Sequence, residues 1–449
     1  MPFVVIAFFW HIGPRSRALC LSYHLGMAEA RSNVLSFETA RHVVEQQAAL
    51  VAVPRAETVD LLAAAGRVLA EPILADRDLP PFPRSTRDGY AVRSADLSVL
   101  PATLEVIGEI KAGEKLDGIP ANIGSGKCAA IMTGAPLPSG ADAVVMVEYS
   151  SQAGKHVELT RGVASGENVV PRGAEATQGS VLVDRGQRLT EAALALAASV
   201  GKSRVPVYVR PGVAVLTTGD EIVDVAASPG PTQIRNSNSY SLATQVLRAG
   251  GQPMLLPIAP DEPDSLRQLI ELGLKSDLLL MTGGVSMGRY DLVEQVLSEM
   301  QAEFFFTGAE IQPGRPVVFG KCGAGTSAHN GDSVSSAGTY FFGLPGNPVS
   351  TMVTFELFAR PMLEAIAGQL PRKLTFLHAR LKSEIRVKAG LTRFLPAILS
   401  GEFANSQVEL VAWQGSGDIA ATARSNCYAV IPPDREKIAA GEWVALMMR

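Results

Sequence analysis

The sequence predicts an α/β multidomain protein in which a parallel α/β domain is joined to small β domains. Between residues 209 and 370, apolar runs alternate with helical patterns, as they do in βαβ units. Residues 84–172 and 371–449 instead show short apolar segments separated by turns that contain Gly and Pro. The chain has 449 residues, which corresponds to about two to four domains.

Composition and charge limit the possible partners. Hydrophobic residues make up 47% of the chain and charged residues 19%, which favours buried cores over extended disorder. The net charge is -4, so we expect no nucleic-acid and no membrane partner. The four cysteines, Cys20, Cys128, Cys322 and Cys427, are scattered and form no CxxC pair. This argues against a zinc site or a disulfide framework and fits a reducing compartment, the cytoplasm.

The first 32 residues do not resemble a folded domain. Residues 3–10 are apolar, but so short a run cannot span a bilayer, and no basic region precedes it. We therefore expect residues 1–32 to be an extension that is disordered or not native, with Met27 as a candidate start. A membrane anchor is the alternative interpretation.

An N-terminal linker domain is expected from residues 33–83 and 173–208. Ser36 is a suitable N-cap for a helix that places Phe37, Ala40 and Val44 on one face. A second helix is expected over 59–69, and a third between Thr190 and 201. The prolines of segment 79–83 require an extended chain.

The remaining segments give three further domains. Within 84–172, expected strands at 129–132 and 143–147 flank a turn at 136–140, which favours a small barrel-like β domain. Within 209–370, strands are expected at 212–216, 254–258 and 278–281, and helices at 239–247, 264–274 and 292–300. Residues 322–338 are rich in Gly and Ser and are interpreted as a surface insertion. A C-terminal β domain is expected over 371–449.

Acidic and glycine-containing clusters follow the three expected strands of the α/β domain. These clusters lie at 217–221, at 260–262 and at 282–286, and Asp291 comes shortly after the last. Ligands of open parallel sheets bind beyond the carboxyl ends of the strands, where glycines let backbone amides approach a phosphate. Glu221, Asp261 and Asp291 are suitable Mg²⁺ ligands. The alternative is that these acids only cap helices.

A fourth element, GLPGNPVS at 343–350, resembles a strand that turns directly into a helix. Asn347 is a suitable N-cap and Pro348 a suitable first helical residue. This arrangement predicts free amides near Val349 and Ser350, where an anion would bind. Nearby, Arg315 in the segment PGRP (313–316) supplies a cation. The alternative is a stiff turn beside a solvated arginine.

These segments together resemble the molybdopterin molybdenumtransferase family, which includes the E domains of plant and animal proteins. The resemblance covers about residues 33–449 and rests on the order of eight motifs rather than on any one. They are LPPF (79–82) with RDGYAVR (87–93), IMTGAP (131–136), AVVMVE (143–148), ENV (167–169) with RG (172–173), TGDE (218–221), GGVS (283–286), PGRP (313–316) and GLPGNPVS (343–350).

The resemblance implies a four-domain, elongated homodimer whose active site is shared between subunits. Enzymes of this kind insert molybdenum from molybdate into adenylylated molybdopterin, with Mg²⁺-dependent release of AMP. A molybdopterin adenylyltransferase is then the expected substrate donor. Two alternatives stay open: this chain is itself the adenylyltransferase, since the α/β domain type is shared, or it is a non-catalytic scaffold of the same fold.

The resemblance also implies roles for individual residues, in three groups. The catalytic group is Asp88, Thr133, Glu148, Glu221, Asp261 and Asp291. Substrate binding is implied for Thr218, Gly219, Asp220, Gly283, Gly284, Ser286, Pro345, Gly346, Asn347 and Pro348. Molybdate binding is implied for Arg315, Pro316, Ser350, Arg393 and Ser416. The alternative for each is a structural role: a turn fixed by Asp88, solvated strand residues at Thr133 and Glu148, and ordinary surface at Arg393 and Ser416.

The chain departs from the family pattern at three positions. Many relatives carry lysines before the PGRP segment, where this chain has Gly308 and Gln312. Two positive charges that would face the anions are thus missing, and anion affinity is weaker unless Arg315 and the helix end compensate. Glu175 stands near the place of an aspartate that relatives often carry.

Overall fold

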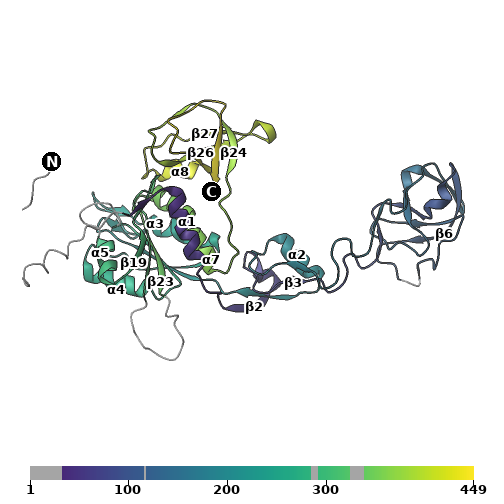
Figure 1. Ribbon diagram of the computed structural model, residues 1–449, viewed down its shortest axis with the longest axis horizontal. Coiled ribbons are helices and arrows are strands. Elements are labelled where there is room, and N and C mark those ends of the chain that lie inside the picture. The colour runs from purple at the N-terminus through teal and green to yellow at the C-terminus, as the bar shows by residue number, and fades with distance from the viewer. Residues whose placement is uncertain (1–32, 116–117, 285–291, 324–337) are drawn as a thin grey trace, which may run out of the picture.

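The computed structural model describes residues 33–115, 118–284, 292–323 and 338–449. The molecule is elongated (Figure 1), with the α/β domain and the C-terminal β domain at one end and the small β domain at the other. The linker domain lies between them. Within the described ranges, no helix is both long enough and apolar enough to cross a membrane.

Helix α1 (Phe37–Ala48) begins as the sequence predicts, because the Ser36 hydroxyl accepts a hydrogen bond from the Thr39 amide. Its buried residues pack against α7 (Arg360–Ile366), and the preceding β1 (Val34–Leu35) pairs in parallel with β20 (Gly308–Ala309). This first part of segment 33–83, which we expected in the linker domain, therefore packs with the α/β domain.

The linker domain is built from short antiparallel pairs and one helix. Strand β2 (Ala56–Asp60) pairs with β13 (Arg204–Tyr208), and β3 (Ile73–Leu74) pairs with β12 (Val181–Val183). Helix α2 (Glu191–Ser199) is confirmed, with Thr190 as its N-cap. The helix expected over 59–69 is wrong: β2 runs directly into a 3₁₀ turn, Leu61–Ala64. Pairing with β13 overrides the local helical pattern, and Leu62 is left 89% exposed.

The small β domain is a six-stranded sheet with the order β8-β5-β7-β6-β10-β9. Alternate residues face two apolar clusters, so that Val92 and Ala91, for example, pack on opposite sides. The strands expected near 129–132 and 143–147 are confirmed as β7 and β8. The bounds are β5 Gly89–Val92, β6 Ala102–Ile110, β7 Lys127–Ile131, β8 Ala143–Met146, β9 Ser150–Ala153 and β10 His156–Leu159; β4 Arg84–Ser85 and β11 Val169–Val170 form a separate pair.

The α/β domain contains a six-stranded mixed sheet with the order β17-β14-β18-β23-β22-β19. The four strands from β17 to β23 are parallel, as the sequence predicts, whereas the β23–β22 and β22–β19 pairs at one edge are antiparallel. Helices α1, α3 (Asn238–Ala249) and α7 cover one face of the sheet over one apolar cluster, and α4 (Pro263–Gly273) and α5 (Leu292–Glu299) cover the other face over a second cluster. Strand bounds are β14 Gly212–Thr217, β17 Gln252–Leu255, β18 Leu278–Thr282, β19 Glu303–Phe306, β22 Val318–Cys322 and β23 Thr339–Leu344.

The helices of this domain lie close to the expected positions. They are α3 Asn238–Ala249, α4 Pro263–Gly273, α5 Leu292–Glu299, α6 Pro348–Thr354 and α7, with a π-helical turn at Phe355–Ala359. The short pair β15 (Ile222–Val223) and β16 (Ile234–Arg235) lies between β14 and α3. Asn347 precedes α6 with a β-region ψ of 125°, and Pro348 is the first helical residue, as predicted.

The C-terminal β domain shares its sheet with a segment of the α/β region. Strand β21 (Ile311–Gln312) pairs in parallel with β26 (Thr392–Ser400), which places the segment 313–316 at the junction of the two domains. The strand order is β21-β26-β27-β24-β30-β28. The other elements are β24 Leu377–Leu381, β25 Ile385–Arg386, β27 Gln407–Leu410, α8 Ile419–Arg424, β28 Cys427–Ile431, β29 Lys437–Ile438 and β30 Trp443–Met448.

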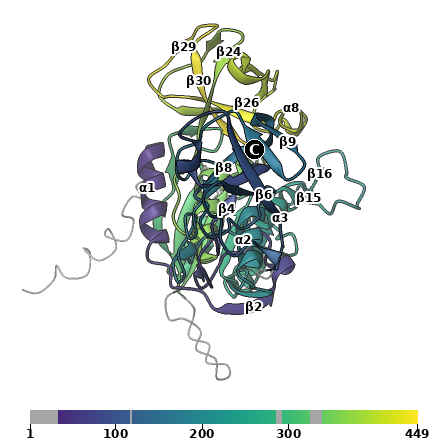
Figure 2. The same cartoon turned by 90° about the vertical axis from the view of Figure 1, so that its right-hand side faces the viewer.

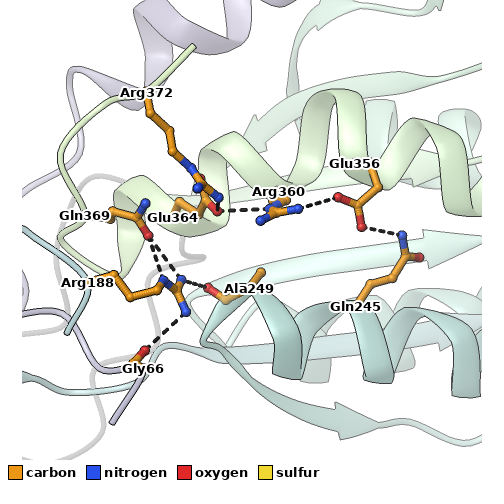
Figure 3. A network of polar contacts seen from close by, with 9 residues as sticks. All are labelled: Gly66, Arg188, Gln245, Ala249, Glu356, Arg360, Glu364, Gln369 and Arg372. Atoms are coloured by element: carbon orange, nitrogen blue, oxygen red, sulfur yellow. Dashed lines mark hydrogen bonds and ion pairs between the residues drawn. The ribbon is translucent and has the colours of Figure 1, made fainter. Parts of the chain in front are cut away.

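A polar network joins the linker domain to the α/β domain (Figure 3). Arg188, from the linker domain, donates hydrogen bonds to the Ala249 carbonyl at the end of α3 and to the Gln369 side chain. Burial lowers the pKa of Arg188. Beside it, the buried Glu364 accepts hydrogen bonds from Arg360 and Arg372. We refer to this network as the Arg188 joint; it fixes the linker domain to the end of the sheet opposite the strand ends described next.

Candidate functional site

The carboxyl ends of three neighbouring parallel strands lie at one edge of the α/β sheet. Thr217 of β14 is in register with Thr282 of β18, and Thr282 is in register with Leu344 of β23. The predicted clusters that follow these strands therefore meet, as expected for a parallel sheet. They form a strand-end cavity of about 630 Å³, lined by Thr217, Thr218, Glu221, Ile222, Ile234, Arg235, Asn236, Ser237, Asn238, Thr282, Gly283, Gly284, Pro316, Pro345, Gly346, Asn347, Pro348, Gly417 and Ile419.

Glycine is required at Gly283, where the backbone segments of this cavity approach one another. Gly283 has a φ of +92°, and a Cβ there would lie 2.3 Å from the Thr218 carbonyl oxygen. On its other side, a Cβ at Gly346 would lie 3.5 Å from the Gly283 Cα. The three strand ends are thus packed backbone to backbone, which leaves their polar groups to face the cavity.

A buried polar network supports the floor of the cavity. Asn238, the first residue of α3, donates through Nδ2 to Thr282 Oγ1 (3.0 Å) and to the Gly346 carbonyl (2.7 Å). Thr282 in turn donates to the Pro345 carbonyl. Across the described residues, Asn238 Oδ1 and Thr218 Oγ1 are buried and have no hydrogen-bond partner. Two polar atoms of the cavity are therefore left for a ligand to satisfy.

The sequence motifs predict Thr218 as a binding residue but not Asn238 or its neighbours Asn236 and Ser237, which also line the cavity. The available signal was the polar run 235–239 at the start of α3. Asn236 and Ser239 bind each other and Thr217 beneath the strand end, with Thr217 Oγ1 and Ser239 Oγ 2.8 Å apart. Spacing alone did not distinguish this network from an ordinary helix cap.

The predicted magnesium ligands are assembled only in part. Glu221 is exposed and lines the strand-end cavity. Asp261 is not among the lining residues; its amide donates to Asp220 Oδ1 (3.1 Å), so Asp220 fixes the turn after the second strand. Asp291 and Ser286 lie outside the described residues. The part of the chain that the structure describes holds no group of three acidic, His or Cys side chains suited to a metal.

A second cavity of about 350 Å³ adjoins the first where the α/β and C-terminal domains meet. Of the residues predicted to bind molybdate, Arg315, Pro316, Ser350 and Ser416 line it. We call it the oxyanion cavity; its lining is Ile311, Gln312, Pro313, Gly314, Arg315, Pro316, Pro345, Asn347, Ser350, Leu391, Trp413, Gly415 and Ser416. Arg315 is the charged residue of this lining, within the ranges described.

The fifth predicted residue, Arg393, lies beside this cavity but is not in its lining. It is in register with Gln312 in the β21–β26 pair, and its guanidinium donates to the Lys388 carbonyl. Burial lowers the pKa of Arg393, and its Nε has no partner among the described atoms. The structure therefore places Arg393 in the wall behind Gln312.

The predicted free amide at the start of α6 is wrong for Val349. Its N–H donates to the Ser416 carbonyl (3.0 Å), so a loop of the C-terminal domain already occupies this position. The adjacent residues Gly417 and Ile419 line the strand-end cavity. The C-terminal domain thus closes one side of both cavities, and Pro316, Pro345 and Asn347 line both of them.

The departures from the family pattern have different structural consequences. Gln312 is exposed and lines the oxyanion cavity, so a longer charged side chain fits there. Gly308 is buried, and a Cβ there would lie 2.9 Å from Val34 Cγ2 on β1. Glu175 forms an exposed ion pair with Arg84 (2.8 Å) in the region of the small β domain.

Asp88, Thr133 and Glu148 come together at one end of the small β domain. Asp88 precedes β5, Thr133 follows β7, and Glu148 lies in a 3₁₀ turn, Val147–Tyr149, after β8. Asp88 Oδ1 accepts hydrogen bonds from the Thr133 amide (2.7 Å) and hydroxyl (2.9 Å), which lower the pKa of Asp88. All three residues are exposed.

Within one chain these three residues are far from both cavities. Figure 1 shows the small β domain at the opposite end of the molecule from the strand ends of the α/β sheet, and Figure 2 looks along that long axis. A single chain therefore does not bring Asp88, Thr133 and Glu148 to Glu221.

Comparison with known proteins agrees with this architecture. Residues 35–201 match the "MoeA N-terminal region (domain I and II)", residues 214–365 a "Probable molybdopterin binding domain", and residues 378–448 the "MoeA C-terminal region (domain IV)". Two curated relatives are named molybdopterin molybdenumtransferase. The one from Staphylococcus aureus (strain MRSA252) is 30% identical over 94% of this chain and 97% of its own length; the one from Bacillus subtilis (strain 168) is 32% identical over 85% and 87%.

A solved structure extends the likeness to three dimensions. The molybdopterin biosynthesis MoeA protein from Pyrococcus horikosii superimposes with a TM-score of 0.65 at 31% identity, over 92% of this chain and 99% of that one. The sequence relatives, the three domain matches and the shared architecture agree over nearly the whole chain. The chain therefore belongs to the molybdopterin molybdenumtransferase family, transferases of the MoeA type that act in molybdenum cofactor biosynthesis.

Proposed function

We propose that this chain inserts molybdenum from molybdate into adenylylated molybdopterin and releases AMP. The observation that carries the proposal is the pair of adjoining cavities, which share Pro316, Pro345 and Asn347. The strand-end cavity is large enough for an organic phosphate, and the smaller cavity is suited to a tetrahedral oxyanion. Two substrates bound in adjoining cavities are held close together in a fixed orientation, so that their reaction becomes effectively unimolecular.

The residues of each cavity suit its ligand. In the strand-end cavity the backbone at Gly283, Gly284 and Gly346 can approach the phosphates of the substrate closely. In the oxyanion cavity the Arg315 guanidinium can donate to two oxygens of molybdate, and the hydroxyls of Ser350 and Ser416 can donate to others. The substrate phosphates and molybdate are both anions, so these donors also reduce the repulsion between them.

Glu221 fits a magnesium ion in this function, because Mg²⁺ commonly takes one or two protein carboxylates and completes its shell with substrate phosphates and water. When bound, the ion would neutralise charge on the phosphoanhydride as AMP leaves. Asp261 is not in the cavity lining, and its amide donates to Asp220 in the turn. We therefore propose Glu221 as the principal carboxylate ligand of the ion.

We further propose that the working form is a homodimer with shared sites. In this arrangement Asp88, Thr133 and Glu148 of one subunit complete the cavities of the other, since a single chain holds the two sets apart. The expected supplier of the adenylylated substrate is a molybdopterin adenylyltransferase, with both proteins in the cytoplasm.

The test is an AMP-release assay with adenylylated molybdopterin, Mg²⁺ and either molybdate or tungstate. We expect AMP to be released when molybdate is added, and Glu221→Ala to reduce the rate by roughly 100-fold or more. Glu271→Ala, which removes an exposed carboxylate on α4 away from the cavities, is the matched control. Binding of the substrate without AMP release would contradict insertion and favour a scaffold, whereas formation of the adenylylated substrate from ATP would favour the adenylyltransferase.

A further inference from the structure

The orientation of the Asn238 side-chain amide is fixed by its hydrogen bonds within the protein. Both hydrogens of its Nδ2 are used, one by Thr282 Oγ1 at 3.0 Å and one by the Gly346 carbonyl at 2.7 Å. A carbonyl oxygen only accepts, so the amide group cannot rotate by 180° without placing two oxygens against each other. Oδ1 is therefore held as an acceptor.

This acceptor is buried on a residue that lines a ligand cavity. Asn238 is 8% exposed and lines the strand-end cavity, and its Oδ1 finds no donor within the described part of the chain. A buried acceptor without a partner has lost its hydrogen bond to water without a replacement, which destabilises the ligand-free cavity. Thr218 Oγ1, on a residue 2% exposed in the same cavity, also lacks a partner there. Asn238 Oδ1 can be satisfied only by a ligand group with hydrogens to donate, whereas the Thr218 hydroxyl can donate or accept.

Most groups of the expected substrate cannot be the hydrogen-bond partner of Asn238 Oδ1. Ionised phosphate oxygens and molybdate oxygens accept hydrogen bonds and would be repelled by Asn238 Oδ1. An amino group on a heterocycle donates two hydrogen bonds and protrudes from the end of the ring, so it can reach a buried acceptor. Residues 214–365, which include Thr218 and Asn238, match a probable molybdopterin-binding domain.

We propose that Asn238 is a specificity-determining residue that accepts a hydrogen bond from the 2-amino group of the pterin ring. The inference rests on the proposed function, because it takes a pterin as the organic substrate. Asn238 thereby determines that the pterin end of the substrate binds at the floor of the strand-end cavity. The phosphates then lie near the glycine-rich strand ends and the oxyanion cavity. It is a binding residue rather than a group that takes part in the reaction.

The test compares two ligands of nearly equal shape. Pterin carries the 2-amino group, whereas lumazine carries an oxygen in its place; binding of each to the full-length protein is followed by fluorescence titration. We expect the wild-type chain to bind pterin about 10–100-fold more tightly than lumazine, because the oxygen of lumazine would leave Asn238 Oδ1 unsatisfied. Asn238→Leu should bring this ratio close to one.

Gln245→Leu is the matched control. Gln245 lies on the same helix and donates through Nε2 to the Met352 carbonyl and to Glu356, the second contact being drawn in Figure 3. Its buried Oε1 has no partner in the described residues, and Gln245 is not among the residues that line the cavity. This variant should keep the wild-type ratio. A loss of affinity for both ligands alike in Asn238→Leu would indicate a purely structural role and overturn the proposal.

Two other outcomes would also overturn it. The first is that the wild-type chain binds pterin and lumazine equally tightly, which would overturn the proposal whether or not Asn238→Leu folds. The second is that the wild-type chain prefers adenosine to inosine and that Asn238→Leu abolishes this preference. The titration needs neither molybdate nor AMP release. Selective pterin binding without AMP release would contradict the proposed insertion alone, and AMP release without selectivity would contradict the role of Asn238 alone.

Discussion

The two ends of this molecule organise their polar residues differently. At the α/β end, Asn238, Thr282 and Ser350 are buried, and the side chains and backbone segments around them enclose two adjoining cavities. At the far end, Asp88, Thr133 and Glu148 are exposed on the rim of a small sheet. The first end therefore has cavities formed within one chain, whereas the second presents exposed polar residues that would meet a second subunit in the proposed homodimer.

The largest effect should come from removing the cation of the oxyanion cavity. Arg315→Ala leaves the lining without a described positive charge, so we expect molybdate-dependent AMP release to fall by about 100-fold or more. Steady-state kinetics over a range of molybdate concentrations would measure this, with the exposed Arg435→Ala as the control. An unchanged molybdate requirement would show that the α/β end does not bind the oxyanion in this cavity.

An intermediate effect should appear when two inactive variants are mixed. If the far end completes the site of a partner, Asp88→Ala and Glu221→Ala should each be inactive alone, but mixed dimers contain one intact site. Random assembly should then restore about a quarter of the wild-type rate of AMP release. Asp88→Ala combined with Glu221→Ala in a single chain provides the background. No recovery after co-refolding, with dimers present, would contradict a shared site.

The smallest effect concerns the two positions that lack the usual lysines. Gln312→Lys adds a charge to the exposed lining and should lower the KM for molybdate by roughly 5–10-fold, with little change in stability. Gly308→Lys should instead destabilise the fold by about 1–3 kcal/mol, because its Cβ would meet Val34 on β1. Chemical denaturation and molybdate kinetics on both variants would test this. Equal destabilisation by the two variants would contradict the difference in packing.

Local features of the α/β end could be predicted from the sequence. The apolar run of β14 and the Asn347-Pro348 pair at the start of α6 each predict an element from its own residues alone. Both predictions are confirmed. Thr218 could be placed in a ligand cavity because parallel strands end at one edge of a sheet.

Features that depend on distant partners could not be predicted. The Val349 amide is occupied by Ser416, which lies far along the sequence, and the unsatisfied Oδ1 of Asn238 is defined by contacts with Thr282 and Gly346. The strand at 56–60 forms because β13, more than a hundred residues away, pairs with it. In each case tertiary contact decides what the local pattern leaves open.

Because the molecule is elongated, the Arg188 joint affects the position of the small β domain. It fixes the linker domain at Ala249 and Gln369, close to the pivot of an arm that carries the small β domain at its tip (Figures 1 and 3). A small rotation at the pivot produces a much larger displacement at the tip. In the proposed homodimer, the precision with which Asp88 and Thr133 meet the other subunit would therefore depend on hydrogen bonds at the opposite end of the arm.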